Sequence, residues 1–126
     1  ITIKIGFMGD ATSPAIGDLW PSFQTSATIA NNLANTIGWT QGVQFETVFA
    51  DDGCEGAGGA TTTGASAAQS LIDAGVWGVV GGACSSASMS ANAVLSAAGI
   101  PMISYASTSA VLSDAVSYPD FFRVVP

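Results

Sequence analysis

The apolar positions along the chain change their spacing repeatedly, from the pattern of strands to that of helices and back. Short apolar runs predict strands, at residues 3–8, 43–50, 76–80, 101–105 and 121–125. Apolar residues at three- and four-residue steps predict helices between them, at residues 17–37, 61–74 and 85–98, with a short turn or helix near 110–112. Gly38, Gly75 and Gly99 are expected to end the three helices. Strands that alternate with helices predict an α/β fold, an open parallel sheet with helices on both faces.

Length and charge narrow the function classes. A chain of 126 residues supports one domain over 1–126. Lys4 and Arg123 are its only basic residues, against nine acids, so the net charge is −7. Phosphate binding needs clustered basic side chains, and nucleic acid is therefore excluded as a partner. No apolar run reaches the roughly 20 residues of a membrane span, which excludes membrane insertion. No signal peptide precedes the first strand, as expected of a processed chain.

Two turns point to a binding site. Gly81 and Gly82 let the chain leave the third strand tightly, and the helix that follows begins at Ser85 or Ser86. The turn falls at the carboxyl edge of the sheet, where open α/β folds bind ligands. The helix N-terminus and the Ser85 hydroxyl favour an anion such as a carboxylate. The alternative is that Ser85 or Ser86 is a plain helix N-cap.

The second turn, Ser104–Ser109, follows the next strand and should lie beside the first. The backbone carbonyl of Ala106 could accept from an ammonium group, and the Thr108 hydroxyl could bind either charged end of a zwitterion. The alternative is a polar turn whose side chains bond only to nearby backbone.

The sequence contains no complete catalytic motif. Asp51 and Asp52 could suggest a metal site, but a third acid and a nearby lysine are missing, so a role in the turn is favoured. The glycines at 56–60 lack the lysine of a phosphate-binding loop. Without histidine the chain cannot build a Ser–His pair. We therefore predict a binding protein that is not an enzyme and holds no metal or cofactor. Trp20, Trp39 and Trp77 are expected in core or interface packing, and the alternative for Trp20, just beyond the first loop, is a place in the lining of a ligand pocket.

The two cysteines follow different strands. Cys54 and Cys84 therefore fall at the same edge of the sheet, where either a disulfide or a pair of free thiols would fit.

Four segments together resemble a known family: IKIGFMGDATSP, DDGCEG, GGACSSASMSANAVLSAAGIPMIS and YPDFFRVVP. They are similar to the amino-terminal lobe of the branched-chain amino-acid (Leu/Ile/Val) binding proteins, the type I periplasmic substrate-binding components of ABC importers. This lobe is a Rossmann-like or flavodoxin-like three-layer sandwich. The resemblance implies a disulfide between Cys54 and Cys84. It also implies that Ser85 holds the ligand carboxylate, and that Ala106 and Thr108 contact the ammonium and carboxylate.

The same resemblance implies that Ala83 and Cys84 border the ligand side chain. Ile16 stands where amino-acid binders of this family often have an aromatic pocket residue, and Tyr105 replaces a frequent proline. Other solutes used by relatives of this lobe, such as amides, urea-like molecules or aromatic acids, are therefore alternatives to leucine, isoleucine and valine.

The family has two lobes, so the resemblance implies a chain that carries one lobe and binds its solute weakly or not at all alone. Surface that the rest of the protein would cover is then exposed, and a homodimer could form. The full-length protein would be periplasmic or extracellular and would deliver its solute to an ABC permease. Two other functions stay open: a flavodoxin-like redox or signalling domain, and the ligand-sensing domain of a receptor.

Overall fold

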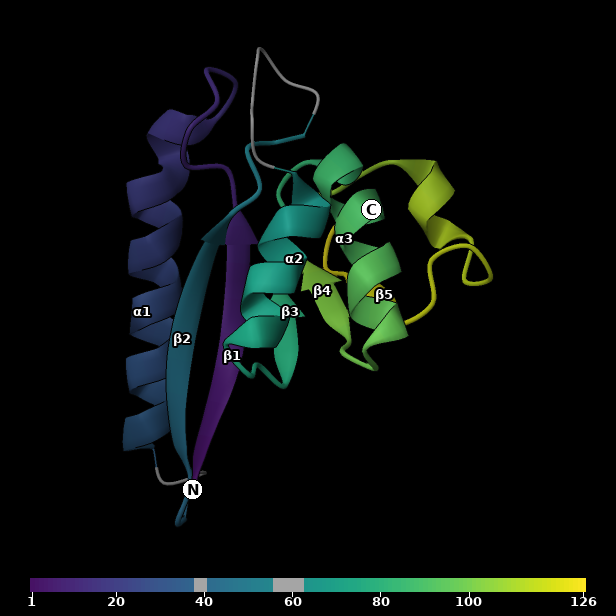
Figure 1. Cartoon of the computed structure of the whole chain (residues 1–126). Helices are drawn as coiled ribbons and strands as arrows, with labels where there is room; N and C mark the ends of the chain where they lie inside the picture. Colours follow the sequence, from purple (N-terminus) through teal and green to yellow (C-terminus); the bar gives the residue numbers. More distant parts are fainter. Residues whose placement is uncertain (38–40, 56–62) are drawn as a thin grey trace.

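The elements alternate in the order that the sequence predicts (Figure 1). A computed structural model describes residues 1–37, 41–55 and 63–126. The strands are β1 (Thr2–Gly9), β2 (Gln44–Asp51), β3 (Gly78–Val80), β4 (Met102–Ser104) and β5 (Phe121–Arg123). The α-helices are α1 (Trp20–Thr36), α2 (Gly64–Asp73) and α3 (Ser85–Ala97), and two short 3₁₀ helices are η1 (Gly17–Leu19) and η2 (Ala110–Ser113).

The five strands form one sheet in the order β2-β1-β3-β4-β5, and every neighbouring pair is parallel. This confirms the predicted α/β fold with a parallel sheet. Because β3 lies between β1 and β4, the loops that follow these three strands leave the same edge of the sheet side by side.

The core lies on the face of the sheet that α2 and α3 cover (Figure 1). Met8, Val79 and Met102 point from the strands into this layer, against Leu71 of α2 and Leu95 of α3. The helices approach closely because their buried positions hold small side chains, among them Ala67, Ala68 and Ala91. The alanine-rich composition therefore serves helix-to-helix and helix-to-sheet packing.

On the opposite face, α1 packs against β1 and β2. Two asparagines fix its position. The Asn35 side chain donates to the carbonyl of Phe45 at 2.9 Å and accepts from its N–H at 2.8 Å, and Asn31 bonds the hydroxyl of Thr47 at 3.1 Å. The Asn35 amide thus satisfies the N–H and carbonyl groups of Phe45 in β2, which is an edge strand of the sheet.

Several element boundaries differ from prediction. Residues 17–19 of the first predicted helix form η1, and α1 itself begins at Trp20. The last three strands are three residues long each, where five were predicted. Helix α2 begins at Gly64, because Thr63 is its N-cap: the Thr63 hydroxyl accepts from the N–H of Ser66, and the Ser66 hydroxyl accepts from the N–H of Thr63. Gly75 and Gly99 follow α2 and α3 with positive φ angles of 81° and 71°, which confirms them as helix stops.

Trp77 is 60% exposed, so of the two predicted positions, core or interface, the core position is wrong. Val76 and Val79 take the buried positions of this apolar run, and the indole is left outside. Trp20, in contrast, packs against Phe7 and Phe49, as predicted.

The predictions for Gly38, Trp39, the glycines at 56–60 and positions 61–62 of the second predicted helix lie outside the described residues. Among the helices of the described ranges, none is both long and apolar enough to cross a bilayer.

Candidate functional site

The turn after β3 passes so close to β1 that it has no room for side chains. A Cβ at Gly81 would lie 2.2 Å from the Met8 carbonyl oxygen, and Gly81 has a φ of 136°. A Cβ at Gly82 would lie 2.7 Å from a carboxylate oxygen of Asp52. The predicted role of these glycines in a tight exit from the strand is therefore confirmed.

Three buried serines join this turn to the loop after β4. The Gly82 carbonyl oxygen lies within hydrogen-bond distance of the hydroxyls of Ser104 at 2.7 Å, Ser107 at 3.1 Å and Ser88 at 3.4 Å. The Ser88 and Ser107 hydroxyls are also 2.8 Å apart, so one of them donates to the other while the other donates to Gly82. Ser88 accepts from the N–H of Gly82 at 3.0 Å. We call these residues, with Gly82, the serine cluster. It holds the two candidate ligand loops in one fixed arrangement.

Ser85 adds a second link between the same loops. Its hydroxyl accepts from the backbone N–H of Ser109 at 3.1 Å. The alternative that Ser85 or Ser86 is the N-cap is wrong: Cys84 has the N-cap position, with an extended backbone, and it makes no side-chain capping bond. The hydroxyl of Ser86 instead donates to the carbonyl of Glu55. The start of α3 is thus fixed by tertiary contacts and not by a local cap.

The first turn of α3 has free donors. Within the part of the chain that the structure describes, the N–H groups of Ser85, Ser86 and Ala87 donate to no other group, and the first helical hydrogen bond is from Ser88 to Cys84. These N–H groups and the helix dipole give the site a partial positive charge without any cation.

The other predicted site residues lie around these loops. Ala83 is buried in the turn after β3. Ala106 and Thr108 are exposed in the loop after β4, where the N–H of Ala106 donates to the Ser104 hydroxyl at 3.2 Å. Ile16 is half-buried in the loop after β1, directly before η1. The structure therefore joins Ser85 to the loop that carries Ala106 and Thr108, whereas no described hydrogen bond joins Ile16 to them.

The expected disulfide is present. Cys54, after β2, bonds Cys84 at the start of α3, with their Cα atoms 5.3 Å apart. The structure therefore contains the bonded form of this cysteine pair, and neither cysteine is a free thiol.

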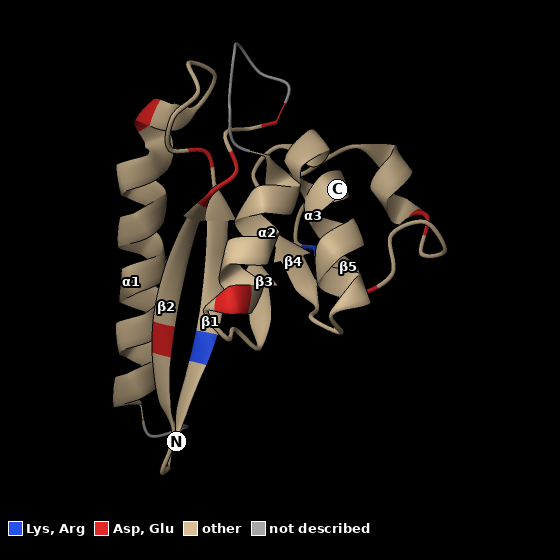
Figure 2. Ribbon diagram, in the orientation of Figure 1, with Lys and Arg blue, Asp and Glu red and all other residues tan. Residues whose placement is uncertain are grey.

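Acidic side chains gather at the same edge of the sheet (Figure 2). Asp51 accepts from the N–H groups of Ala11 and Gly53, both at 2.9 Å, and from the Thr12 hydroxyl at 2.7 Å. These bonds tie the loop after β1 to the end of β2, which confirms that Asp51 has a role in the turns. No group of three or more His, Cys, Asp or Glu residues among the described ones could hold a metal ion.

Asp10 and Asp52 are both fully buried, but their pKa values shift in opposite directions. Burial acts to raise the pKa of Asp10, but hydrogen bonds from the Ser13 hydroxyl and from nearby backbone N–H groups outweigh it and lower the pKa. Burial raises the pKa of Asp52 to about 6 against the bond from the Cys54 N–H, and the charges of neighbouring carboxylates add to the rise. One oxygen of Asp52 has no hydrogen-bond partner among the described residues.

Tyr105 anchors the loop after β4 to β1. Its ring stacks on Phe7 with centroids 5.3 Å apart, and its hydroxyl donates to the Met8 carbonyl at 3.2 Å. Gly9 makes room, since a Cβ there would lie 2.6 Å from the Tyr105 hydroxyl. Burial raises the pKa of Tyr105 above its ordinary value, so the phenol stays a neutral donor.

Sequence reasoning missed the serine cluster and the anchoring role of Tyr105. Ser104 and Ser107 were recognised only as part of a polar turn, and Ser88 was not recognised at all. One signal was present: Ser88 shares its helix face with Ala91 and Leu95, so a hydroxyl there is buried and needs partners. The assembled site offers hydroxyls, backbone groups and free N–H donors, which suit binding of a small polar ligand.

Comparisons with known proteins agree with this description. A family model described as "Receptor family ligand binding region" matches residues 24–126. The branched-chain amino acid transporter substrate-binding protein LivJ from Streptococcus pneumoniae, solved with isoleucine, is 31% identical, with a TM-score of 0.80. The match includes 98% of this chain and 33% of LivJ. An ABC transporter substrate-binding protein from Desulfitobacterium hafniense, solved with Leu, is 30% identical, with a TM-score of 0.77, and 100% of this chain covers 35% of it.

A third structure shows the fold alone. The solute-binding protein from Rhodopseudomonas palustris solved with 3,4-dihydroxybenzoic acid is 18% identical, with a TM-score of 0.77 over 97% of this chain and 31% of its own. The chain thus spans about a third of the length of the solved structures it matches. These relatives are substrate-binding proteins of transporters and not enzymes, in line with the predicted binding function. Because the family model covers most of its length, the chain belongs to the receptor family ligand-binding regions, and its similarity to branched-chain amino-acid binding proteins confirms the predicted resemblance.

Proposed function

We propose that this chain is a solute-binding lobe for ABC-type import, and that its solute is a branched-chain or related amino acid. The observation that carries the proposal is the pairing of the two loops at the carboxyl edge through Ser85 and the serine cluster. Two relatives that are 31% and 30% identical to this chain were solved with isoleucine and leucine, which supports the choice of solute class.

The carboxylate of the solute is assigned to the start of α3. Free N–H groups at the first turn and the Ser85 hydroxyl would donate to it, and the helix dipole would stabilise its charge. Ser85 already accepts from the Ser109 N–H, so its own proton remains available for the ligand.

The ammonium group is assigned to the loop after β4. The exposed Ala106 carbonyl would accept from it, and the Thr108 hydroxyl would bond either charged end. Ala83, Cys84 and Ile16 would border the apolar side chain. Every bond in this scheme is non-covalent, so the solute would be captured and released unchanged.

The larger assembly is also a proposal. The chain would be one lobe of a longer extracytoplasmic protein, whose second lobe closes over the solute and which delivers it to a permease. The lobe alone contacts one side of the ligand, so its affinity should fall far below that of a closed two-lobed protein.

The test is an amide NMR titration of the isotope-labelled chain with millimolar leucine. Small shifts are expected at residues 85–87 and 106–109, with none at Val116, which is exposed in the segment between η2 and β5. Isovalerate, which has only the carboxylate, should shift the first group, and isoamylamine, which has only the ammonium group, the second.

Two variants and a second method sharpen the test. Ser85→Ala should weaken the shifts from leucine and isovalerate, whereas Ser70→Ala, on the exposed surface of α2, should leave them unchanged. Calorimetry of the chain with micromolar leucine should give no heat. Micromolar binding would contradict the proposed role of a second lobe, and absence of shifts at millimolar leucine would contradict the solute assignment.

A further inference from the structure

Arg123 is one of the two basic residues of the chain, and it is the last residue of β5. It pairs with Ser104 at the end of β4, so both residues reach the carboxyl edge of the sheet. Paired residues of neighbouring strands point to the same face of a sheet. The Arg123 side chain therefore extends toward the loop after β4, which the proposed function assigns to the solute.

The guanidinium group holds this loop at two carbonyls. Its Nη1 atom donates to the Ser109 carbonyl at 2.8 Å and lies 3.4 Å from the Ser107 carbonyl oxygen. Its Nη2 atom donates to the Ser113 hydroxyl of η2 at 2.8 Å. A charged donor makes a stronger hydrogen bond than a neutral one. Arg123 thus fixes the loop on both sides of Thr108, a residue of the proposed site.

Ser109 links Arg123 to the carboxylate-binding end of the site. The Ser109 N–H donates to the Ser85 hydroxyl at 3.1 Å. A hydroxyl that accepts a hydrogen bond on one side points its own hydrogen toward another side. Because Arg123 holds Ser109, it also sets the direction in which the Ser85 proton is offered at the start of α3.

The ammonium-binding end of the site has a different anchor. The N–H groups of Ala106 and Ser107 donate to the Ser104 hydroxyl, at 3.2 Å and 2.9 Å. Ser104 belongs to the serine cluster, which fixes this part of the loop to the turn after β3. Loss of Arg123 should therefore loosen the loop at Ser109 and leave the Ala106 carbonyl in place.

The positive charge of Arg123 is directed at the same loop. Within residues 1–37, 41–55 and 63–126, its guanidinium donates to two carbonyls and one hydroxyl and to no carboxylate. The Asp114 carboxylate, which follows η2, instead accepts from the Ser117 hydroxyl at 2.7 Å and the Val116 N–H at 3.0 Å. In a chain with a net charge of −7, a cation bonded to neutral groups attracts an anion to its surroundings.

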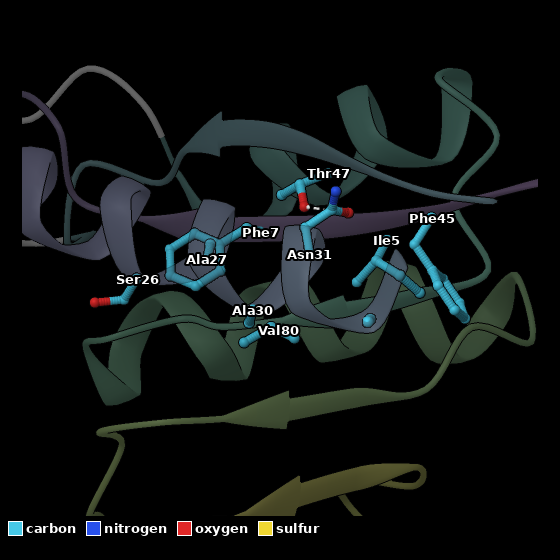
Figure 3. Close-up of a pocket in the computed structure, with 10 residues that line it drawn as sticks. Ile5, Phe7, Ser26, Ala27, Ala30, Asn31, Phe45, Thr47 and Val80 are labelled. Atoms are coloured by element: carbon cyan, nitrogen blue, oxygen red, sulfur yellow. Dashed lines mark hydrogen bonds between the residues drawn. The ribbon is translucent and has the colours of Figure 1, made fainter. Parts of the chain in front are cut away.

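The cavity on the opposite face of the sheet lacks such groups. It has a volume of about 370 Å³ and lies between α1 and the sheet, where Ile5, Phe7 and Val80 line it (Figure 3). Its Asn31 side chain is bonded to the Thr47 hydroxyl at 3.1 Å. None of the described residues that line this cavity is Lys or Arg. A carboxylate is therefore better placed near Arg123 than in this cavity.

We propose that Arg123 is a positioning residue for the solute carboxylate, and that its charge makes the lobe favour solutes with an anionic end. The inference deepens the proposed function and rests on it for the ligand. Arg123 acts through Ser109 and Ser85 and need not touch the solute. Without Arg123, Ser109 loses a charged hydrogen-bond donor, the Ser85 proton loses its fixed direction, and the loop loses positive charge.

The first experiment needs no ligand. Solvent exchange of the Ser109 N–H, measured by NMR, should become about tenfold faster in Arg123→Met, which removes the charge and every donor of the guanidinium. Exchange of the Ser107 N–H should change by less than about twofold. Lys4→Met is the matched control, because it removes the same charge from a side chain that is bonded at the end of α2. An unchanged Ser109 exchange rate in Arg123→Met would overturn the positioning role.

The second experiment titrates isovalerate and isoamylamine into the wild type and the variants at constant ionic strength. For isovalerate, the initial slope of the shifts at residues 85–87 should fall about tenfold in Arg123→Met. Arg123→Lys, which keeps the charge and loses the planar fork, should recover part of that slope. For isoamylamine, the slope at residues 106–109 should change by less than about twofold in both variants. Lys4→Met should match the wild type with both ligands.

Unequal losses for the two ligands distinguish positioning from a damaged fold, which circular dichroism checks in each variant. Equal losses would overturn the proposal. An Arg123→Lys variant that binds isovalerate no better than Arg123→Met would overturn the part assigned to charge. If the wild type shows no shift with either ligand, the proposed function fails, whereas faster Ser109 exchange in Arg123→Met would still establish that Arg123 holds the loop.

Discussion

At the scale of single residues, Asp52 is a carboxyl group whose ionised form is destabilised by the fold. It is fully buried, and burial raises its pKa to about 6 from an ordinary value of 3.8. The folded state therefore keeps the Asp52 proton over a pH range in which the unfolded chain has lost it. By linkage, this residue stabilises the fold at low pH, and that contribution is lost as pH rises from about 4 to 6.

Asp52→Asn should accordingly be more stable than the wild type at pH 7, by about 1–3 kcal/mol, with a much smaller difference near pH 4. The asparagine keeps an oxygen for the Cys54 N–H bond and carries no charge. Urea unfolding of both proteins at several pH values measures the difference. A difference that stays constant from pH 4 to 8 would mean that Asp52 titrates normally.

Asp10→Asn is the control variant, because the pKa of Asp10 shifts in the direction opposite to that of Asp52. Since hydrogen bonds lower the pKa of Asp10, its charge stabilises the fold above the unfolded pKa, and this stability is lost as pH falls through the folded value. The variant should therefore lose stability at neutral pH and approach the wild type in acid. Opposite pH trends for two neighbouring aspartates would exclude a general effect of net charge.

At the scale of secondary-structure elements, α2 and α3 touch through a glycine. A Cβ on Gly64 would lie 1.9 Å from the Ala87 carbonyl oxygen and 2.6 Å from the Ser90 hydroxyl. The backbone of α3 cannot yield to it, because the serine cluster and the disulfide fix the start of that helix.

Gly64→Ala should therefore destabilise the chain by about 1–3 kcal/mol, although alanine is the better helix former by about 1 kcal/mol. Gly78→Ala is the control, since its Cβ would meet only the Pro101 carbonyl oxygen at 3.7 Å, an ordinary contact. Thermal unfolding of the two variants compares them directly. Equal melting temperatures for Gly64→Ala and the wild type would show that the helices can move apart.

The elements also show how far sequence reasoning reaches. Spacing of apolar residues predicts the alternating elements and places the two loops at one sheet edge, because both depend on local pattern and chain order. It could not place Trp77, since an apolar run does not reveal which of its residues face the core. Nor could it find Ser88 or the burial of Asp52, because their partners come from loops distant in sequence. The Cys54–Cys84 bond came from the family resemblance, and the residues alone left it open.

At the scale of the whole molecule, the disulfide is the covalent link between distant parts of the sheet. Cys54 follows β2 and Cys84 follows β3, and β1 lies between these strands, so the bond crosses the carboxyl end of β1. It joins residues 30 apart in sequence. Closing a loop of that length restricts the unfolded chain, which corresponds to about 3–4 kcal/mol of stability on the chain-entropy account.

Replacing both cysteines by alanine should therefore lower the free energy of unfolding by about 3–4 kcal/mol, measured in urea against the oxidised wild type. The fold should persist, because Glu55 still binds the start of α2 through the Gly64 N–H at 3.0 Å and the start of α3 through Ser86 and Ser90. Reduced and alkylated wild type serves as the control, since it loses the bond but keeps both sulfur atoms. If the double variant matched the oxidised protein in stability, these Glu55 contacts would already restrain the two elements and the bond would be redundant. If instead hydrogen exchange rose at residues 82–88 while β1 stayed protected, the bond would act on the candidate site more than on the fold.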